Sequence, residues 1–176
     1  MWNALCEIQQ NDLMKNHPLL VIGQSRFGKG LFADASIAAG TVICKVSGKQ
    51  MDFHTTLQMN EKESHGLQID FDSYILCEAP FLYSNHSCEP NCALNKKLEM
   101  FALRDIAAGE ELLWDYSTSM LERHWTMQCA CGSSNCRQVI RDFDLLPMEL
   151  QRYYLRLGIV LPFIERFVQQ QLAKSA

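Results

Sequence analysis

Three cysteines late in the chain have the spacing of metal ligands. Cys129, Cys131 and Cys136 form a C-x-C-x4-C pattern around a Gly/Ser/Asn turn. Short loops of this kind wrap thiolates around one tetrahedral zinc ion, and a closed structural site takes four ligands. The sequence offers three candidates for the fourth ligand: Cys88, Cys92 and His124. Because four protein ligands leave no open position, we expect such an ion to stabilise the fold and not to catalyse a reaction.

A second group of reactive side chains lies at residues 85–92, which read NHSCEPNC. It combines a carboxamide, an imidazole and two thiols beside a proline. Three interpretations are open: a polar turn, part of a metal site, or a Cys/His nucleophile. A nucleophilic cysteine needs a base within hydrogen-bond reach, and the two-residue spacing of His86 and Cys88 does not establish that contact.

Two further stretches carry weaker signals. Gly28-Lys29-Gly30 is a G-x-G element, which indicates either a close approach of the backbone to another group or a turn. Residues 109–116 read GEELLWDY, so that acidic side chains precede a Trp and a Tyr. This second stretch fits a core strand as well as the rim of a site.

The elements that must position these groups read as short β-strands joined by tight turns. Runs rich in β-branched and aromatic residues predict five strands: Leu19–Gly23, Thr41–Val46, Ser73–Glu78, Leu98–Arg104 and Glu111–Tyr116. We expect residues 24–30 to form a loop and residues 95–97 to form a hairpin turn.

A weak internal repeat links two of the turns. Residues 36–42 and residues 105–111 share the sequence Ile-Ala-Ala-Gly after a strand and before the next strand. Gly40 and Gly109 suit a left-handed turn position, where a glycine has no steric penalty.

The last part of the chain changes to a helical pattern. Pro147 precedes apolar residues at i, i+3, i+4 and i+7, and Gly158 follows them. Pro162 opens a second segment with apolar residues at helical spacing. We expect two helices that pack on the β core, and a homodimer through these helices is the alternative use of their apolar faces.

Composition narrows the classes of function. The chain has 176 residues, 48% hydrophobic and 20% charged, with a net charge of −4. It has no apolar run of about 18 residues, so we expect no membrane span, and no basic excess of the kind that grips nucleic acid phosphates. A basic peptide suits the acidic balance better. With no visible secretory signal, the eight cysteines are expected to be reduced thiols or metal ligands in an intracellular protein, nuclear or cytoplasmic, and not disulfides.

Read in order, four elements resemble the SET-domain protein-lysine methyltransferases that carry a post-SET zinc loop. They are residues 26–33 (RFGKGLFA), residues 85–91 (NHSCEPN), residues 109–116 (GEELLWDY) and the C-x-C-x4-C loop. The resemblance implies a mainly β, SET-type (β-clip) fold of short sheets in which the second and third elements thread as a pseudoknot. It divides the chain into an N-terminal arm (1–16), a SET domain (17–116), a post-SET zinc loop (125–141) and a C-terminal helical extension (142–176).

The resemblance also implies a reaction and its residues. Family members transfer a methyl group from S-adenosylmethionine to a lysine of a protein substrate, so we expect a basic peptide segment, such as a histone tail, as partner. Tyr116 matches the catalytic tyrosine. The implied cofactor-binding residues are Phe27, Gly28, Lys29, Gly30, Asn85, His86 and Tyr116. The implied ligands of the one structural zinc ion are Cys88, Cys129, Cys131 and Cys136. Trp114 and Val46 match positions on the substrate channel.

Two departures from the family pattern keep other functions open. Val46 or Ser47 stands where the family commonly has a Tyr, and Leu82 stands where an Arg is common. The first alternative is a catalytically weak SET-like module that binds basic peptides. The second is a zinc-stabilised interaction protein without a cofactor site.

Overall fold

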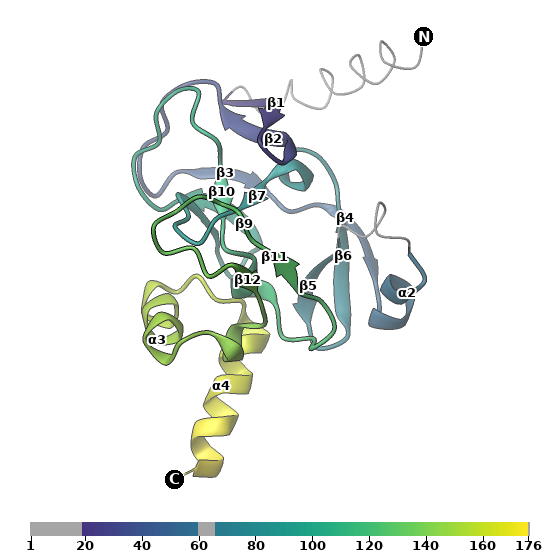
Figure 1. The fold of residues 1–176 in the computed structure, drawn as a ribbon. Coiled ribbons are helices and arrows are strands. Elements are labelled where there is room, and N and C mark those ends of the chain that lie inside the picture. Colours follow the sequence, from purple (N-terminus) through teal and green to yellow (C-terminus); the bar gives the residue numbers. More distant parts are fainter. Residues whose placement is uncertain (1–18, 60–65, 176) are drawn as a thin grey trace.

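The computed structural model describes residues 19–59 and 66–175, which form short β-sheets with two helices at the C-terminal end (Figure 1). The predicted mainly β fold is therefore confirmed, while the predicted N-terminal arm (1–16) lies outside the described residues. No helix within these two ranges has the length and apolar character of a membrane span.

A hairpin and two three-stranded sheets make up the body. The hairpin pairs β1 (Leu20–Ser25) with β2 (Gly28–Ala33). One sheet has the order β3-β9-β8, with bounds Val42–Lys45, Glu99–Ala102 and Cys92–Leu94. The other has the order β4-β6-β5, with bounds Gly48–Met51, Ser73–Cys77 and Gly66–Asp70. All pairs in these sheets are antiparallel, which suits the short connections between their strands.

The structure corrects two of the sequence-based expectations. Residues 24–30 are not a loop, because β1 and β2 join through the two residues Arg26 and Phe27, and the G-x-G element lies in β2. Glycine is depleted in strands, so the start of β2 could not be recognised as a strand from its sequence. The strand expected at Glu111–Tyr116 shortens to β10 (Leu113–Trp114), and Tyr116 instead begins a 3-10 helix, η2 (Tyr116–Ser119). The turn expected at residues 95–97 does connect β8 to β9.

The two Ile-Ala-Ala-Gly turns pair with each other. Ile37 and Ile106 form a two-way backbone bridge, with N–H···O distances of 2.9 and 2.8 Å. Gly40 and Gly109 have φ values of +79° and +80°, the left-handed conformation that favours glycine. The repeat thus forms two turns of the same backbone conformation, which pair with each other through their isoleucines.

A parallel pair of very short strands forms the centre of the fold. β7 (Asn85–His86) pairs with β10 in parallel, with Asn85 opposite Leu113 and His86 opposite Trp114. A further backbone bond, from Ser87 N–H to Trp114 O, extends the contact. Stretches whose paired residues are 28 positions apart therefore lie side by side, as the predicted pseudoknot requires.

The helical C-terminal end packs into the same core as the sheets. α3 (Met148–Leu157) ends at Gly158, whose φ is +67°, and α4 (Pro162–Ser175) projects away from the body at the end opposite β1–β2 (Figure 1). Tyr154 of α3 and Phe163 and Ile164 of α4 are buried in the main core. The prediction that the helices pack on the β core is confirmed at these residues. The other described elements are α2 (Phe53–Leu57), η1 (Phe81–Tyr83), β11 (Met127–Gln128), β12 (Val139–Ile140) and η3 (Phe143–Leu145).

Candidate active site and metal centre

The G-x-G element of β2 lies against the β7 strand. The side-chain amide of Asn85 donates to Lys29 O at 3.1 Å and to Glu111 Oε1 at 2.7 Å. A Cβ atom at position 30 would lie 2.5 Å from Glu111 Oε1 and 2.9 Å from Ser25 Cβ. Gly30 is therefore required by close approach, which is one of the two meanings that the sequence left open for this element.

Tyr116 follows directly after the β7–β10 pair, where its phenol is fixed. Its hydroxyl donates to Ser84 O at 2.9 Å, and its ring packs on Trp114 with centroids 4.8 Å apart. Burial raises the pKa of the Tyr116 phenol above its usual value, with smaller contributions from Cys77 and Glu111. The phenol is therefore neutral at physiological pH, because an acid with a raised pKa keeps its proton.

His86 connects this strand pair to the cysteine cluster. Burial lowers the pKa of the ring to about 4, although Asp115 opposes the shift, so the imidazole is neutral. Its Nδ1 accepts from Tyr116 N–H at 3.3 Å. The proton of the neutral ring therefore lies on Nε2, which faces Cys88 Sγ at 3.4 Å. This contact is not that of a nucleophile with its base, since Nε2 is the protonated nitrogen.

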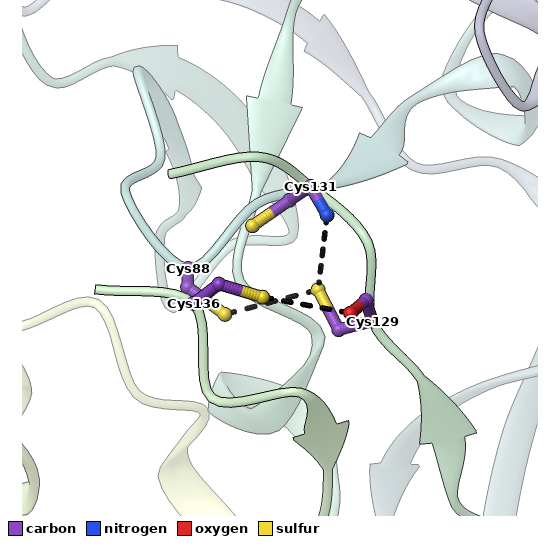
Figure 2. Close-up of side chains that lie close together, drawn as sticks. All are labelled: Cys88, Cys129, Cys131 and Cys136. Carbon is purple, nitrogen blue, oxygen red and sulfur yellow. Dashed lines mark hydrogen bonds between the residues drawn. The ribbon is translucent and has the colours of Figure 1, made fainter. Parts of the chain in front are cut away.

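Four cysteines converge from two distant parts of the sequence. The Sγ atoms of Cys88, Cys129, Cys131 and Cys136 all lie within 4.8 Å of one another (Figure 2). Cys88 Sγ and Cys129 Sγ are 3.9 Å apart, and a tetrahedron with Zn–S bonds of about 2.3 Å has sulfur–sulfur edges of about 3.8 Å. The donor set and its size fit one zinc ion.

Backbone donors around the cluster suit thiolate ligands. Arg137 N–H donates to Cys88 Sγ at 3.3 Å, and Cys131 N–H donates to Cys129 Sγ at 3.4 Å. Second-shell donors of this kind orient metal ligands and stabilise their charge. The other candidates for a fourth ligand lie elsewhere: Cys92 is buried in β8, and His124 packs on Phe53.

Asp115, between Trp114 and Tyr116, is a buried carboxylate with partners from three segments. Arg137 makes a bidentate pair with it at 2.6 and 2.7 Å. Tyr154 of α3 donates to it at 2.8 Å, and Ser117 N–H donates at 3.1 Å as η2 begins. Asp115 therefore connects the cysteine loop and the helical extension to the junction of β10 and η2, where Tyr116 lies.

A cavity of about 460 Å³ has Tyr116 in its lining and none of the residues of the G-x-G element. Trp114, Tyr116, Leu82 and Ser84 are among its lining residues, and Val46 is not. Val46 is 5% exposed within the main core, so the structure gives it no place on this cavity. Trp114 Nε1 is a buried donor without a hydrogen-bond partner among the described residues.

A family model for the SET domain matches residues 28–117, which hold the G-x-G element, both strands of the parallel pair and Tyr116. The chain belongs to the SET-domain family. Histone-lysine N-methyltransferase 2B of Homo sapiens is 32% identical over a 130-residue alignment that covers 64% of this chain and 5% of that protein. Histone-lysine N-methyltransferase ash1 of Drosophila melanogaster is 30% identical over 129 residues, 64% of this chain and 6% of that protein. This SET-domain chain therefore spans only a small part of the length of its curated relatives.

A solved structure has the same fold. The crystal structure of the methyltransferase domain of human histone-lysine N-methyltransferase SETMAR matches with a TM-score of 0.58 and 22% identity. The match covers 70% of this chain and 58% of that chain. It supports the SET-type fold described above.

Several residues of this SET-domain site were not predicted from the sequence. Asp115, Arg137 and Tyr154 form one network, and Glu111 holds Asn85. The only signal was their position: Asp115 precedes Tyr116, and Arg137 follows Cys136. Their contacts join residues 22 to 39 positions apart, which no local pattern reports.

Proposed function

We propose that this SET domain is an S-adenosylmethionine-dependent protein-lysine N-methyltransferase that acts on a basic peptide segment, such as a histone tail. One observation carries the proposal: the neutral phenol of Tyr116 lines the aromatic cavity and donates to Ser84 O, next to Asn85, whose amide donates to Lys29 O of the G-x-G element. The names of the relatives, which are histone-lysine N-methyltransferases, support the same reaction.

The cofactor would be held by the backbone of Phe27, Gly28, Lys29 and Gly30, with Asn85, His86 and Tyr116 beside it. S-adenosylmethionine supplies an electrophilic methyl group on a positive sulfonium. At Gly28 an added Cβ would meet no atom within 4 Å, so the main chain there is open to a ligand. Glu111 accepts one hydrogen of the Asn85 amide, so that this side chain has a fixed orientation.

The residues of the cavity would prepare the lysine amine. Only the neutral amine can attack, and holding an ordinary lysine neutral near pH 7.4 costs about 4 kcal/mol. Trp114 and Phe81 form an aromatic wall of the cavity, and an apolar environment disfavours the ammonium form. Because the Tyr116 hydroxyl donates its hydrogen bond to Ser84 O, its oxygen can accept an amine N–H and orient the nucleophile. No general base is required of Tyr116.

The proposed reaction is tested by transfer of labelled methyl groups to core histones and to a whole-cell lysate. Tyr116→Phe should lower transfer at least a hundredfold, the effect of losing one positioned polar group in a catalytic site. Tyr153→Phe is the matched control, because Tyr153 is 48% exposed on α3. Label that persists in Tyr116→Phe would contradict the assigned role. Cofactor binding without label in either pool would favour a binding module.

We also propose that Cys88, Cys129, Cys131 and Cys136 hold one structural zinc ion. The four sulfurs and their N–H donors support it. Metal analysis should find one zinc per chain, and Cys88→Ser should lose tight binding because three thiolates remain. Cys92→Ser is the control and should keep one zinc per chain. Equal zinc content in both variants would contradict the ligand set.

Two further proposals concern the compartment and the oligomeric state of the protein. Intracellular action, in the nucleus or cytoplasm, is supported by the free cysteines of the described residues and by the names of the relatives. The homodimer through the C-terminal helices stays a prediction, supported by the exposed side chains of Tyr153, Leu157 and Leu172. Sedimentation equilibrium would test it.

A further inference from the structure

We propose that Glu122 is a specificity-determining residue of the substrate cavity: its carboxylate pairs with a cationic side chain, Arg or Lys, that neighbours the target lysine in the peptide. The inference rests on the proposed methyltransferase function, which places the target lysine at Tyr116. It adds a requirement for a second positive charge at a defined spacing.

The described lining of the cavity carries a single fixed charge. Among its described lining residues, Glu122 is the only Asp, Glu, Lys or Arg. The rest of the wall is largely aromatic and aliphatic, and aromatic faces attract cations. A lone carboxylate among aromatic rings is a complementary environment for a guanidinium or ammonium group and a repulsive one for an acidic side chain.

The aromatic rings of the cavity fall into two clusters. Glu122 lies at one of them, and the proposed position of the target lysine lies at the other. Trp114 packs on Tyr116 and on Phe81, with centroids 4.8 and 5.4 Å apart. Phe53 packs on Tyr74 and His124, with centroids 5.9 and 5.4 Å apart. Glu122 belongs to the second cluster, because Tyr74 O–H donates to Glu122 Oε2 at 2.6 Å. A cavity of about 460 Å³ has the size of a site for a multi-group ligand.

The backbone around Glu122 is held in place by buried acceptors. Gln68 Oε1 accepts from Leu121 N–H at 2.8 Å. The carboxylate of Asp142 accepts from Glu122 N–H at 3.0 Å and from Arg123 N–H at 2.9 Å. Gln68 and Asp142 are each 3% exposed. The carboxylate of Glu122 is therefore preorganised, which lowers the entropic cost of pairing with a ligand.

The nearest cation in sequence does not neutralise Glu122. Arg123 pairs with Asp144, and its Nε lies 4.0 Å from Asp142 Oδ2. It is not among the residues that line the cavity. Among the described residues, Glu122 therefore has no ion-pair partner, and a substrate cation would supply one.

The test uses the full chain, loaded with zinc, and peptides that contain one lysine in a neutral background. A single Arg is placed at each position within about four residues of the lysine, since an extended chain advances about 3.3 Å per residue. Each peptide has a twin with citrulline, a neutral group of nearly the same shape. The quantity measured is the Arg-to-citrulline ratio of kcat/KM, together with the same ratio of affinities from fluorescence anisotropy.

We expect a ratio of about ten at one or two positions, a typical effect of one partly desolvated charge pair. Glu122→Gln should reduce the ratio to near one, and Tyr74→Phe should reduce it partly. Glu122→Lys should reverse the preference, so that a peptide with Glu at that position is favoured. Glu149→Gln, exposed on α3, is the matched control and should keep the ratio.

Two results would overturn the inference: a ratio near one at every position, or a ratio that is equal in wild type and Glu122→Gln. Either result with methyl transfer intact leaves the proposed function standing. Conversely, an affinity ratio that depends on Glu122 in a protein that transfers no methyl group would support the pairing of Glu122 with a peptide cation and reject the methyltransferase function.

Discussion

The G-x-G region and the cavity, which form the two sides of the site around Tyr116, are built differently. On the G-x-G side, contacts run through main chain and one carboxamide: Asn85 reaches Lys29 O, and Gly30 leaves no room for a side chain. On the cavity side, contacts run through aromatic rings and one carboxylate, Glu122.

The difference follows from what each side would bind. A ligand shared by a whole family can be held by backbone and by a few short motifs, since its shape does not vary. A peptide varies, so its site is formed by side chains that can change while the fold stays the same. The first side should therefore tolerate almost no substitution, and the second should tolerate many with a change of preference.

Asp115→Asn should affect both sides, because this carboxylate stabilises the junction of β10 and η2, where Tyr116 lies. The change leaves Arg137 without its charged partner in a largely buried position, and breaking a buried pair in this way costs about 3–5 kcal/mol. Chemical denaturation measures the loss in the free energy of unfolding. Asp70→Asn, in a pair with Arg166 that is half exposed on both sides, is the control and should cost less than about 1 kcal/mol. If both variants lost the same free energy of unfolding, the Asp115 network would not have the stabilising role assigned to it.

Gly30→Ala should affect the G-x-G side alone. The added Cβ would displace Glu111 Oε1, which holds Asn85, and would meet the less movable Ser25 Cβ. We expect cofactor affinity to fall about a hundredfold, or about 2.7 kcal/mol, by calorimetric titration. Gly66→Ala is the matched change on the cavity side, where the nearest atom to a new Cβ is 3.7 Å away. A similar loss of cofactor affinity in Gly66→Ala would remove the distinction between the two sides.

The pH dependence of transfer should show no ionisation of Tyr116 below pH 10. Burial raises the pKa of its phenol above the usual value, and a raised pKa keeps the neutral form at higher pH. Between pH 7 and 9, kcat/KM should therefore rise about tenfold per unit as the free lysine loses its proton. Suppose that kcat/KM falls again below pH 10. If the pH of this fall shifts with the pKa of the substrate lysine, the fall comes from the substrate and not from Tyr116. If it stays at the same pH for substrates of different pKa, it would contradict the raised pKa of Tyr116.

The residues of the G-x-G side could be predicted from the sequence, and those of the cavity side could not. Gly30, Asn85 and Tyr116 belong to short motifs that resemble a family, so their proximity could be inferred before the structure. The same resemblance preferred Cys88 over Cys92 and His124, and the four sulfurs do converge. Local reasoning could not have made that choice, because Cys88 is 41 residues from Cys129.

The cavity could not be inferred in this way because its residues come from many elements. Phe53, Tyr74 and Glu122 are remote in sequence and fall in no motif. Val46 was expected on the channel from its alignment with a family position, yet it packs in the core. The G-x-G element was expected in a loop, because glycine weakens a strand and conceals it.

The partners of Asp115 also bear on how the chain is made. A chain that leaves the ribosome at about 5–20 residues per second exposes Asp115 well before Arg137 and Tyr154, which bind its carboxylate. Until Tyr154 has emerged, the carboxylate next to Tyr116 lacks its full set of partners. The site around Tyr116 is therefore completed from the C-terminal side of the nascent protein, and a stop codon near residue 145 would leave the SET core translated but without this support.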